Sequence, residues 1–185
     1  MKTTNMLAIL TLAALMTGCV PSLHPLYTEK DVVFDPALVG TWEEKDGKNT
    51  WTFQKSGDKG YELVSTEGGE PGRFEAHLVQ LGKYSFLDTY PEEMGPQNDM
   101  HKVHLIRAHF IWRIWREGDL LRIATLDNDW LKKLITEKKV QIPHEELGKD
   151  YLVLTAKTQQ IQKLVLQFAD DPKAFPDPGE FRRRK

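Results

Sequence analysis

Hydrophobic and polar residues alternate with a period of two along much of the chain between Leu38 and Leu126. Such alternation is typical of strands that bury one face. Turn signals such as Asp46-Gly47 and Glu117-Gly118 separate consecutive runs, and glycine there favours tight hairpin loops. The sequence therefore predicts an antiparallel meander with strands at 38–44, 49–55, 60–66, 72–81, 83–90, 103–116 and 119–126.

After residue 126 the apolar spacing changes to three and four, which is typical of helices. Asp127 offers a capping oxygen to a helix over 128–138, and Thr158 can cap a second helix that carries Ile161 and Phe168 on one face. Residues 151–155 are predicted to form an eighth strand. We therefore expect a mainly β fold: an antiparallel up-and-down barrel or strongly curved sheet of about eight strands, with a helix between the last two strands and a C-terminal helix.

The first nineteen residues have the three-part layout of a secretory signal. Lys2 gives a positive start, an apolar run covers 6–16, and small residues precede Cys19. The run is too short to span a bilayer stably. We expect 1–18 to be a cleaved signal, 19–37 to be a lipidated tether with a short docking segment at Val32 to Phe34, and 38–185 to be one domain.

The quartet Met16-Thr17-Gly18-Cys19 resembles the lipobox of bacterial lipoproteins, with methionine where that family usually has leucine. In the family the cysteine sulfur receives diacylglycerol. The resemblance implies a covalent lipid on Cys19 and a membrane as partner. Val20, in place of aspartate, implies an outer-membrane location facing the periplasm in a Gram-negative source. Cys19 is the only cysteine, so we expect no disulfide.

Gly40-Thr41-Trp42 resembles the glycine-x-tryptophan motif that opens the first strand of lipocalins. In that family the glycine turns the chain into the barrel and the indole plugs its closed end. Family members also place an arginine over this tryptophan, and Arg122 is the residue expected to do so here. The threonine-aspartate-tyrosine motif of classical lipocalins is absent, because Asp88-Thr89-Tyr90 has a different order.

The charge balance argues against a nucleic-acid partner. The chain carries 25 basic and 27 acidic side chains, a net charge of −2, whereas phosphate binding requires a clustered positive face. One basic cluster stands at the C-terminus, at residues 182–185. We expect it to be a solvated tail, with a contact to lipid phosphate or to a partner as the alternative.

No catalytic signature stands out, so an enzyme is not supported. The segment His144-Glu145-Glu146-Leu147-Gly148 lacks the second histidine of a zinc-protease helix. His101 and His104 would point to opposite faces of a strand, and we expect neither a metal site nor another cofactor beyond the lipid.

The long strand at 103–116 carries the most suggestive polar set. Arg107, His109, Arg113 and Trp115 share one face, and guanidinium groups beside an imidazole and an indole would suit an anionic headgroup. These four are the candidate ligand-binding residues. The alternative is that the arginines meet acidic neighbours in solvent while the aliphatic face lines the core.

Two functions remain open. The first is a membrane-anchored, non-catalytic binding module for a small hydrophobic or amphipathic ligand, with a hollow interior lined by Phe53, Phe74, Phe86, Phe110 and Trp112 or their opposite-face neighbours. The second is an envelope assembly or protein-interaction lipoprotein with a filled barrel, which recognises its partner through the loop at 91–102 or through the C-terminal tail.

Overall fold

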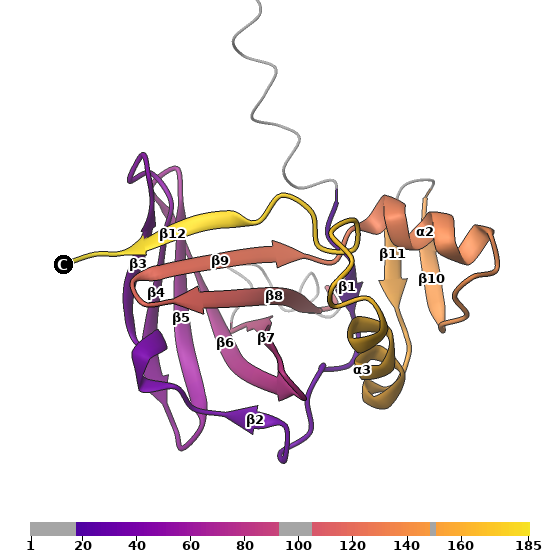
Figure 1. Ribbon diagram of the computed structural model, residues 1–185, viewed down its shortest axis with the longest axis horizontal. Helices are drawn as coiled ribbons and strands as arrows, with labels where there is room; N and C mark the ends of the chain where they lie inside the picture. Colours follow the sequence, from indigo (N-terminus) through magenta and orange to yellow (C-terminus); the bar gives the residue numbers. More distant parts are fainter. Residues whose placement is uncertain (1–17, 93–104, 149–150) are drawn as a thin grey trace, which may run out of the picture.

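The computed structural model of the chain describes residues 18–92, 105–148 and 151–185 (Figure 1). Its helical elements are the 3₁₀ helix η1 (Pro36–Leu38), α2 (Asn128–Thr136) and α3 (Thr158–Gln167). Its strands are β1 (Pro21–Ser22), β2 (Val32–Val33), β3 (Gly40–Glu44), β4 (Thr50–Ser56), β5 (Gly60–Glu67), β6 (Glu70–Leu81), β7 (Tyr84–Pro91), β8 (His109–Glu117), β9 (Leu120–Thr125), β10 (His144–Leu147), β11 (Tyr151–Leu154) and β12 (Gly179–Arg183).

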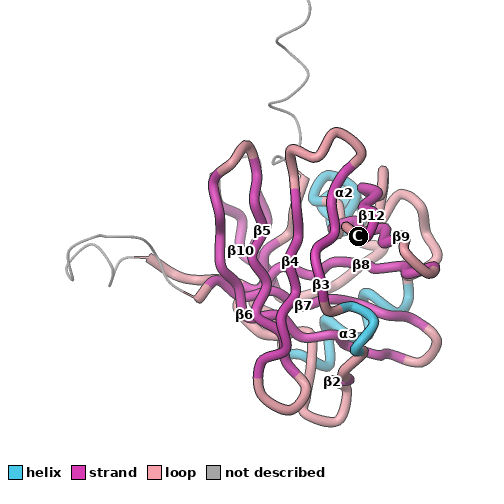
Figure 2. Tube along the Cα trace, turned by 90° about the vertical axis from the view of Figure 1, so that its left-hand side faces the viewer, coloured by secondary structure: helices cyan, strands magenta, loops and turns pink. Residues whose placement is uncertain are grey.

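Eight antiparallel strands form a closed barrel. Strands β3 to β9 follow one another in chain order, and β12 pairs with both β9 and β3 to complete the ring. Figure 2 looks onto the side of the barrel where β3, β4 and β5 are neighbours. The expected fold class is confirmed: a mainly β, up-and-down barrel with one helix between the last strands and one near the C-terminus. Closure also leaves no free edge on the barrel itself.

The strand that closes the barrel is not the one the sequence indicated. Residues 151–154 form β11, which pairs with β10 and β1 outside the ring. The closing strand is β12, which covers 179–183 and so includes the first two residues of the segment 182–185 that was expected to be a solvated tail. The strand was not expected because charged residues flank its one apolar side chain: Phe181, which faces inward and is 4% exposed, stands between Glu180 and Arg182. One apolar residue between charged neighbours is a weak signal for a strand, yet it completes the period-two pattern.

Side chains fill the interior of the barrel. Its cluster of buried residues, called here the inner core, is dominated by aromatic and branched aliphatic groups, and Trp42, Phe53, Tyr61 and Leu63 are at most 1% exposed. Trp51 packs edge-on against Trp112 at 5.0 Å between ring centroids. The inner core consists of Leu38, Trp42, Trp51, Phe53, Tyr61, Leu63, Ala76, Leu78, Leu87, Ile114, Leu121, Ile123 and Phe181.

A second cluster, the outer core, lies on the outside of the barrel wall. Outward-facing residues of β6 to β9, such as Val79 and Phe86, pack there against α2, α3 and the strands β1 and β11. In Figure 1 these elements gather at the end of the barrel opposite the C-terminus. Ile161 and Val165 of α3 are fully buried in this cluster, as the spacing of the helix predicted.

The segment expected to be a tether is packed on the barrel throughout its length. Val20, Ser22 and Leu26 are at most 2% exposed, β1 pairs with β8, and β2 pairs with β6. Strand β2 lies where the sequence suggested a docking segment. The three prolines of the segment do not free it, because proline is tolerated in extended chain and short edge strands.

One end of the barrel is closed by η1 and the glycine-x-tryptophan motif. Trp42 is fully buried, and its indole N–H donates to the carbonyl of Leu38 in η1 at 2.9 Å. The guanidinium of Arg183 lies 4.4 Å from the Trp42 ring centroid and donates to the carbonyls of Val39 and Ala37. A Cβ atom at Gly40, whose φ is +129°, would fall 2.6 Å from Arg183 Nη1.

The arginine over the tryptophan is therefore Arg183 and not Arg122. Residue 122 stands between the inward-facing Leu121 and Ile123, so it points out of the barrel and pairs with Glu117. The closing strand β12 brings Arg183 onto this tryptophan at the closed end. Because that strand was not expected, the sequence could not indicate the correct partner.

Replacing Arg183 by alanine is expected to lower the free energy of unfolding by about 2 kcal/mol, since two part-buried carbonyls lose a charged donor and the indole loses its cation. The matched control is Arg182→Ala, because Arg182 is the exposed neighbour on the same strand and its loss should cost less than about 0.5 kcal/mol. Chemical denaturation followed by tryptophan fluorescence measures both. Equal effects of the two changes would contradict the assigned role of Arg183.

Candidate functional site

Cys19 lies directly on the folded body. It forms an antiparallel bridge with Asp127, and its sulfur lies 3.4 Å from the hydroxyl of Thr125, the last residue of β9. The first N–H of α2, that of Asn128, donates to the carbonyl of Gly18 at 2.7 Å. The position where the lipobox would be cut and acylated is therefore held at the rim of the barrel, at the end opposite the η1 plug.

The four candidate ligand-binding residues are found on the outside of the barrel wall. Strand β8 turns Phe110, Trp112 and Ile114 inward, so its alternate residues His109, Arg113 and Trp115 face outward. The predicted division of faces holds within this strand. Arg107, just before β8, is exposed, lies 4.8 Å from the Tyr90 ring centroid and donates to the carbonyls of Pro91 and Glu92.

His109 belongs to a buried polar group that fixes the N-terminal segment. Its Nδ1 lies 2.7 Å from Oδ1 of Asp88, which is 1% exposed. The other oxygen of Asp88 accepts the backbone N–H of Leu26 at 2.7 Å. A buried carboxylate is stable only when paired and hydrogen-bonded, and here both oxygens have partners. Asp88 thus joins β7, β8 and the N-terminal segment.

Arg113 is enclosed by aromatic rings, whereas the alternative from the sequence placed it in solvent beside acidic residues. It is 6% exposed, and its guanidinium lies 4.8 to 5.2 Å from the ring centroids of Trp115, Tyr84 and Phe86. Its Nη1 donates to the carbonyls of Ser85 and Ile114. The structure therefore brings Arg113 and Trp115 together, but as parts of a packed wall that presents no open anion site.

The interior leaves little room for a ligand. Of the phenylalanines expected to line a hollow centre, Phe53 and Phe74 do face the inner core, whereas Phe86 faces the outer core. A cavity of about 160 Å³ lies at the plugged end, between Asp35, Leu38, Leu78, Ser85, Ile114 and Arg116. Sites for drug-sized molecules usually hold roughly 300 to 1,000 Å³.

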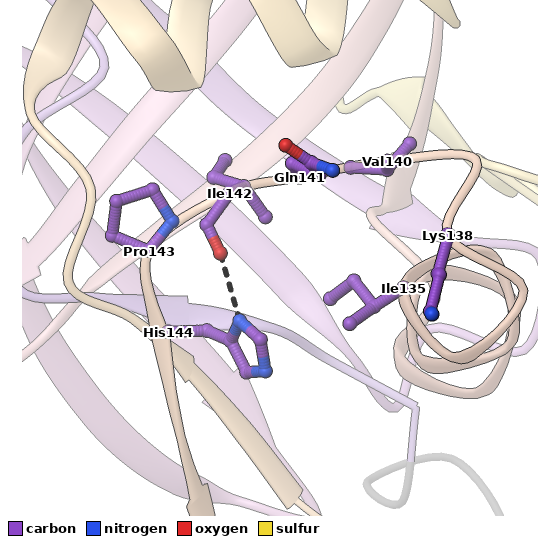
Figure 3. A pocket seen from close by; sticks show the side chains of 7 residues that line it. All are labelled: Ile135, Lys138, Val140, Gln141, Ile142, Pro143 and His144. Atoms are coloured by element: carbon purple, nitrogen blue, oxygen red, sulfur yellow. Dashed lines mark hydrogen bonds between the residues drawn. The ribbon is translucent and has the colours of Figure 1, made fainter.

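A larger hollow of about 400 Å³ lies outside the barrel, where the chain leaves α2 and enters β10 (Figure 3). Ile135, Val140, Ile142 and Pro143 make its apolar part, and Lys138, Gln141 and His144 add polar groups. His144 Nδ1 lies 2.8 Å from the carbonyl of Ile142, which orients the ring. Lys138 has a φ of +58°, an unusual conformation for a lysine that ends the helix sharply.

Sequence reasoning missed both Asp88 and this hollow. Asp88 shares a strand face with Phe86, so an acidic residue amid apolar neighbours was the available signal. The hollow had no signal, because its residues come from a helix end and a link that looked merely polar.

His101 and His104 lie outside the described residues. Among the residues that the structure describes, no group of three or more His, Cys, Asp or Glu side chains could hold a metal ion.

Comparison with protein-family models, with curated proteins and with solved structures found no match. Within the described part of the chain, no helix has both the length and the apolar character needed to cross a membrane.

His77 should make stability depend on pH. Its ring centroid lies 4.3 Å from that of Tyr27 with the two planes tilted by 32°, and its Nε2 lies 3.6 Å from a carboxylate oxygen of Glu75. Burial holds the pKa of His77 below its ordinary value of 6.5, although the charges of Glu75 and Asp88 oppose this shift. The folded state therefore binds a proton less readily than the unfolded state, so the contribution of His77 to stability is fully present above the unfolded pKa and is lost as the pH falls from there through the lower pKa of the folded state. Between about pH 7.5 and about pH 5, the wild type should lose more unfolding free energy than His77→Gln.

The control is His24→Gln, because His24 is exposed and its replacement should change stability by less than about 0.5 kcal/mol. Denaturant titrations at the two pH values give the comparison. If His77→Gln and the wild type lose equal stability on acidification, the depressed pKa of His77 is contradicted.

Proposed function

We propose that this chain is an envelope lipoprotein, anchored by acyl chains on Cys19, in which a filled barrel serves as a rigid, non-catalytic interaction body. The proposed location is the outer membrane, facing the periplasm. The observation that carries the proposal is the combination of a lipobox-like sequence with a barrel whose centre is occupied by its own aromatic side chains.

Acylation at Cys19 is chemically simple. The sulfur–hydrogen bond is replaced by a thioether to diacylglycerol from a membrane phospholipid, whose headgroup phosphate leaves with the proton. The side chain of Cys19 is partly exposed at the rim, so a lipid can extend from it. Burial of acyl chains contributes about 0.8 kcal/mol per methylene, and two or more chains make a stable anchor.

The lipocalin-like features support a scaffold role. Gly40, Trp42 and Arg183 pack together at the closed end, in the arrangement that the resemblance implies for that family. Small eight-stranded barrels either fill with side chains or hold one small ligand. Here the buried inner core favours the filled kind, so recognition belongs to the outer surface.

Changing Cys19 to alanine should abolish incorporation of labelled fatty acid and move the protein from the membrane fraction to the soluble fraction, because this sulfur is the proposed acceptor. Thr125→Ala is the matched control: it removes the hydroxyl nearest the sulfur and keeps the thiol. Fatty-acid labelling of cells followed by fractionation measures acylation and membrane association in both variants. Labelling that persists in Cys19→Ala would rule out this anchor.

Native mass spectrometry of the gently purified protein should find the acylated chain without a noncovalent lipid-like adduct, since the cavity of about 160 Å³ at the plugged end is too small for a lipid. An adduct retained at stoichiometric level, and unaffected by changes in the external hollow, would contradict the filled barrel.

The external hollow supports a second candidate function, the binding of a small amphipathic ligand. Its apolar walls and the nearby Lys138 and His144 suit a short acyl or aromatic group that carries a carboxylate or phosphate. In this case the spectra would show an adduct that is lost in Ile135→Glu. Such a result would assign ligand binding to the outside of the barrel.

A further inference from the structure

The residues that follow the proposed cleavage point alternate strictly between two faces. Val20 and Ser22 are 2% and 0% exposed and face the outer core. Cys19 and Pro21 are partly exposed, and Leu23 is 41% exposed. Because successive side chains of an extended chain point to opposite sides, Cys19, Pro21 and Leu23 share one face. The acyl-bearing sulfur and an exposed leucine therefore lie on the same side of this segment.

Strand β11, which pairs with β1, and strand β10, which pairs with β11, continue that face. Ser22 pairs with Leu154 of β11, and Leu154 and Leu152 are buried in the outer core, so Tyr151 points to the other side. Leu147 of β10 pairs directly with Tyr151. Leu147 and Tyr151 are 58% and 44% exposed. We call Leu23, Leu147 and Tyr151 the apolar platform. In Figure 1 the strands β1, β11 and β10 stand together beside the barrel.

Exposed apolar groups are concentrated in this region. The described residues contain five exposed large hydrophobic side chains, and three of them form the platform. A fourth, Ile106, is 79% exposed and stands just before β8, the barrel strand that pairs with β1. Single exposed hydrophobic residues need no explanation, but a group on one face of adjacent strands marks an interaction surface.

We propose that the apolar platform rests on the lipid surface that holds the acyl chains of Cys19, so that the side sheet of β1, β11 and β10 seats the barrel on the bilayer. The proposal rests on the proposed function, because it requires a lipid on Cys19. Leu23 follows Cys19 by four residues, which in extended chain is about 13 Å. Both the anchor and the platform therefore reach the same membrane face.

The packing of the N-terminal segment makes this seating rigid. A flexible tether would let the body turn freely above the membrane, whereas Val20, Ser22 and Leu26 are buried. Tyr151 suits the boundary between headgroups and acyl chains, where an aromatic ring with a polar end is favoured. Glu145, two residues before Leu147 on β10, is exposed on the same face, where its carboxylate would lie among the headgroups.

Removal of the signal does not abolish the contact that positions Cys19. In the uncut chain the N–H of Asn128 donates to the carbonyl of Gly18. A fatty acid joined by an amide to the Cys19 nitrogen places a carbonyl at the same position along the chain. The start of α2 therefore keeps an acceptor for this N–H, and Cys19 keeps its place at the barrel rim.

The test uses the full acylated protein in vesicles of phosphatidylethanolamine and phosphatidylglycerol. Once Cys19 is a thioether, a cysteine introduced by Leu147→Cys is the one free thiol and accepts an environment-sensitive fluorophore. The control is Leu166→Cys on α3, whose leucine is 39% exposed. Helix α3 packs against the opposite side of β11, so this label points away from the platform.

The label at position 147 should show blue-shifted emission and quenching by lipids that carry a nitroxide near the headgroup, while the label at 166 keeps the emission it has in water. Equal, water-like emission at both positions, in protein whose mass confirms acylation, would overturn the platform and leave the proposed function standing. A mass without acyl groups would overturn both proposals. The last outcome concerns the Cys19→Ala protein, labelled at position 147 and measured without vesicles. If this protein has the mass of a dimer and its label is blue-shifted, the platform binds a second copy of the chain and the membrane contact is overturned.

Discussion

The hydrogen bond from the backbone of Leu26 to the buried carboxylate of Asp88 holds the N-terminal segment to the barrel. Asp88 is already engaged with His109 of β8, so the segment is fastened to the wall through a paired, desolvated charge. Together with the pairing of β1 and β2, this contact converts what would otherwise be a linker into a layer of the fold. The position of Cys19 relative to the barrel follows from it.

The two terminal segments thus pack at different places on one barrel. The C-terminal strand β12 closes the ring and carries Arg183 to Trp42 at the plugged end, which makes the inner core self-contained. The N-terminal segment covers the outer wall and brings Cys19 to the other end. Because side chains fill the interior, the proposed interaction function belongs to the outside of the molecule.

Period-two alternation was sufficient to predict the fold class and the strands β3 to β9, because each of these strands buries one face in the inner core. It failed for β12, in which Phe181 is the one large apolar residue and its neighbours Glu180 and Arg182 are charged. The candidate residues His109, Arg113 and Trp115 were assigned to the correct face. Their role could not be predicted, because it depends on Asp88 and on aromatic rings brought in from β7.

Native-state hydrogen exchange of the acylated protein tests most directly whether the N-terminal segment is part of the rigid body. The N–H of Leu26 donates a hydrogen bond to Asp88. Its hydrogen should exchange as slowly as the amide hydrogens in the middle of β7 and β8, because the segment and these strands open only when the whole barrel unfolds. Exchange of this amide at the rate of an unstructured peptide, with the barrel strands still protected, would contradict the account.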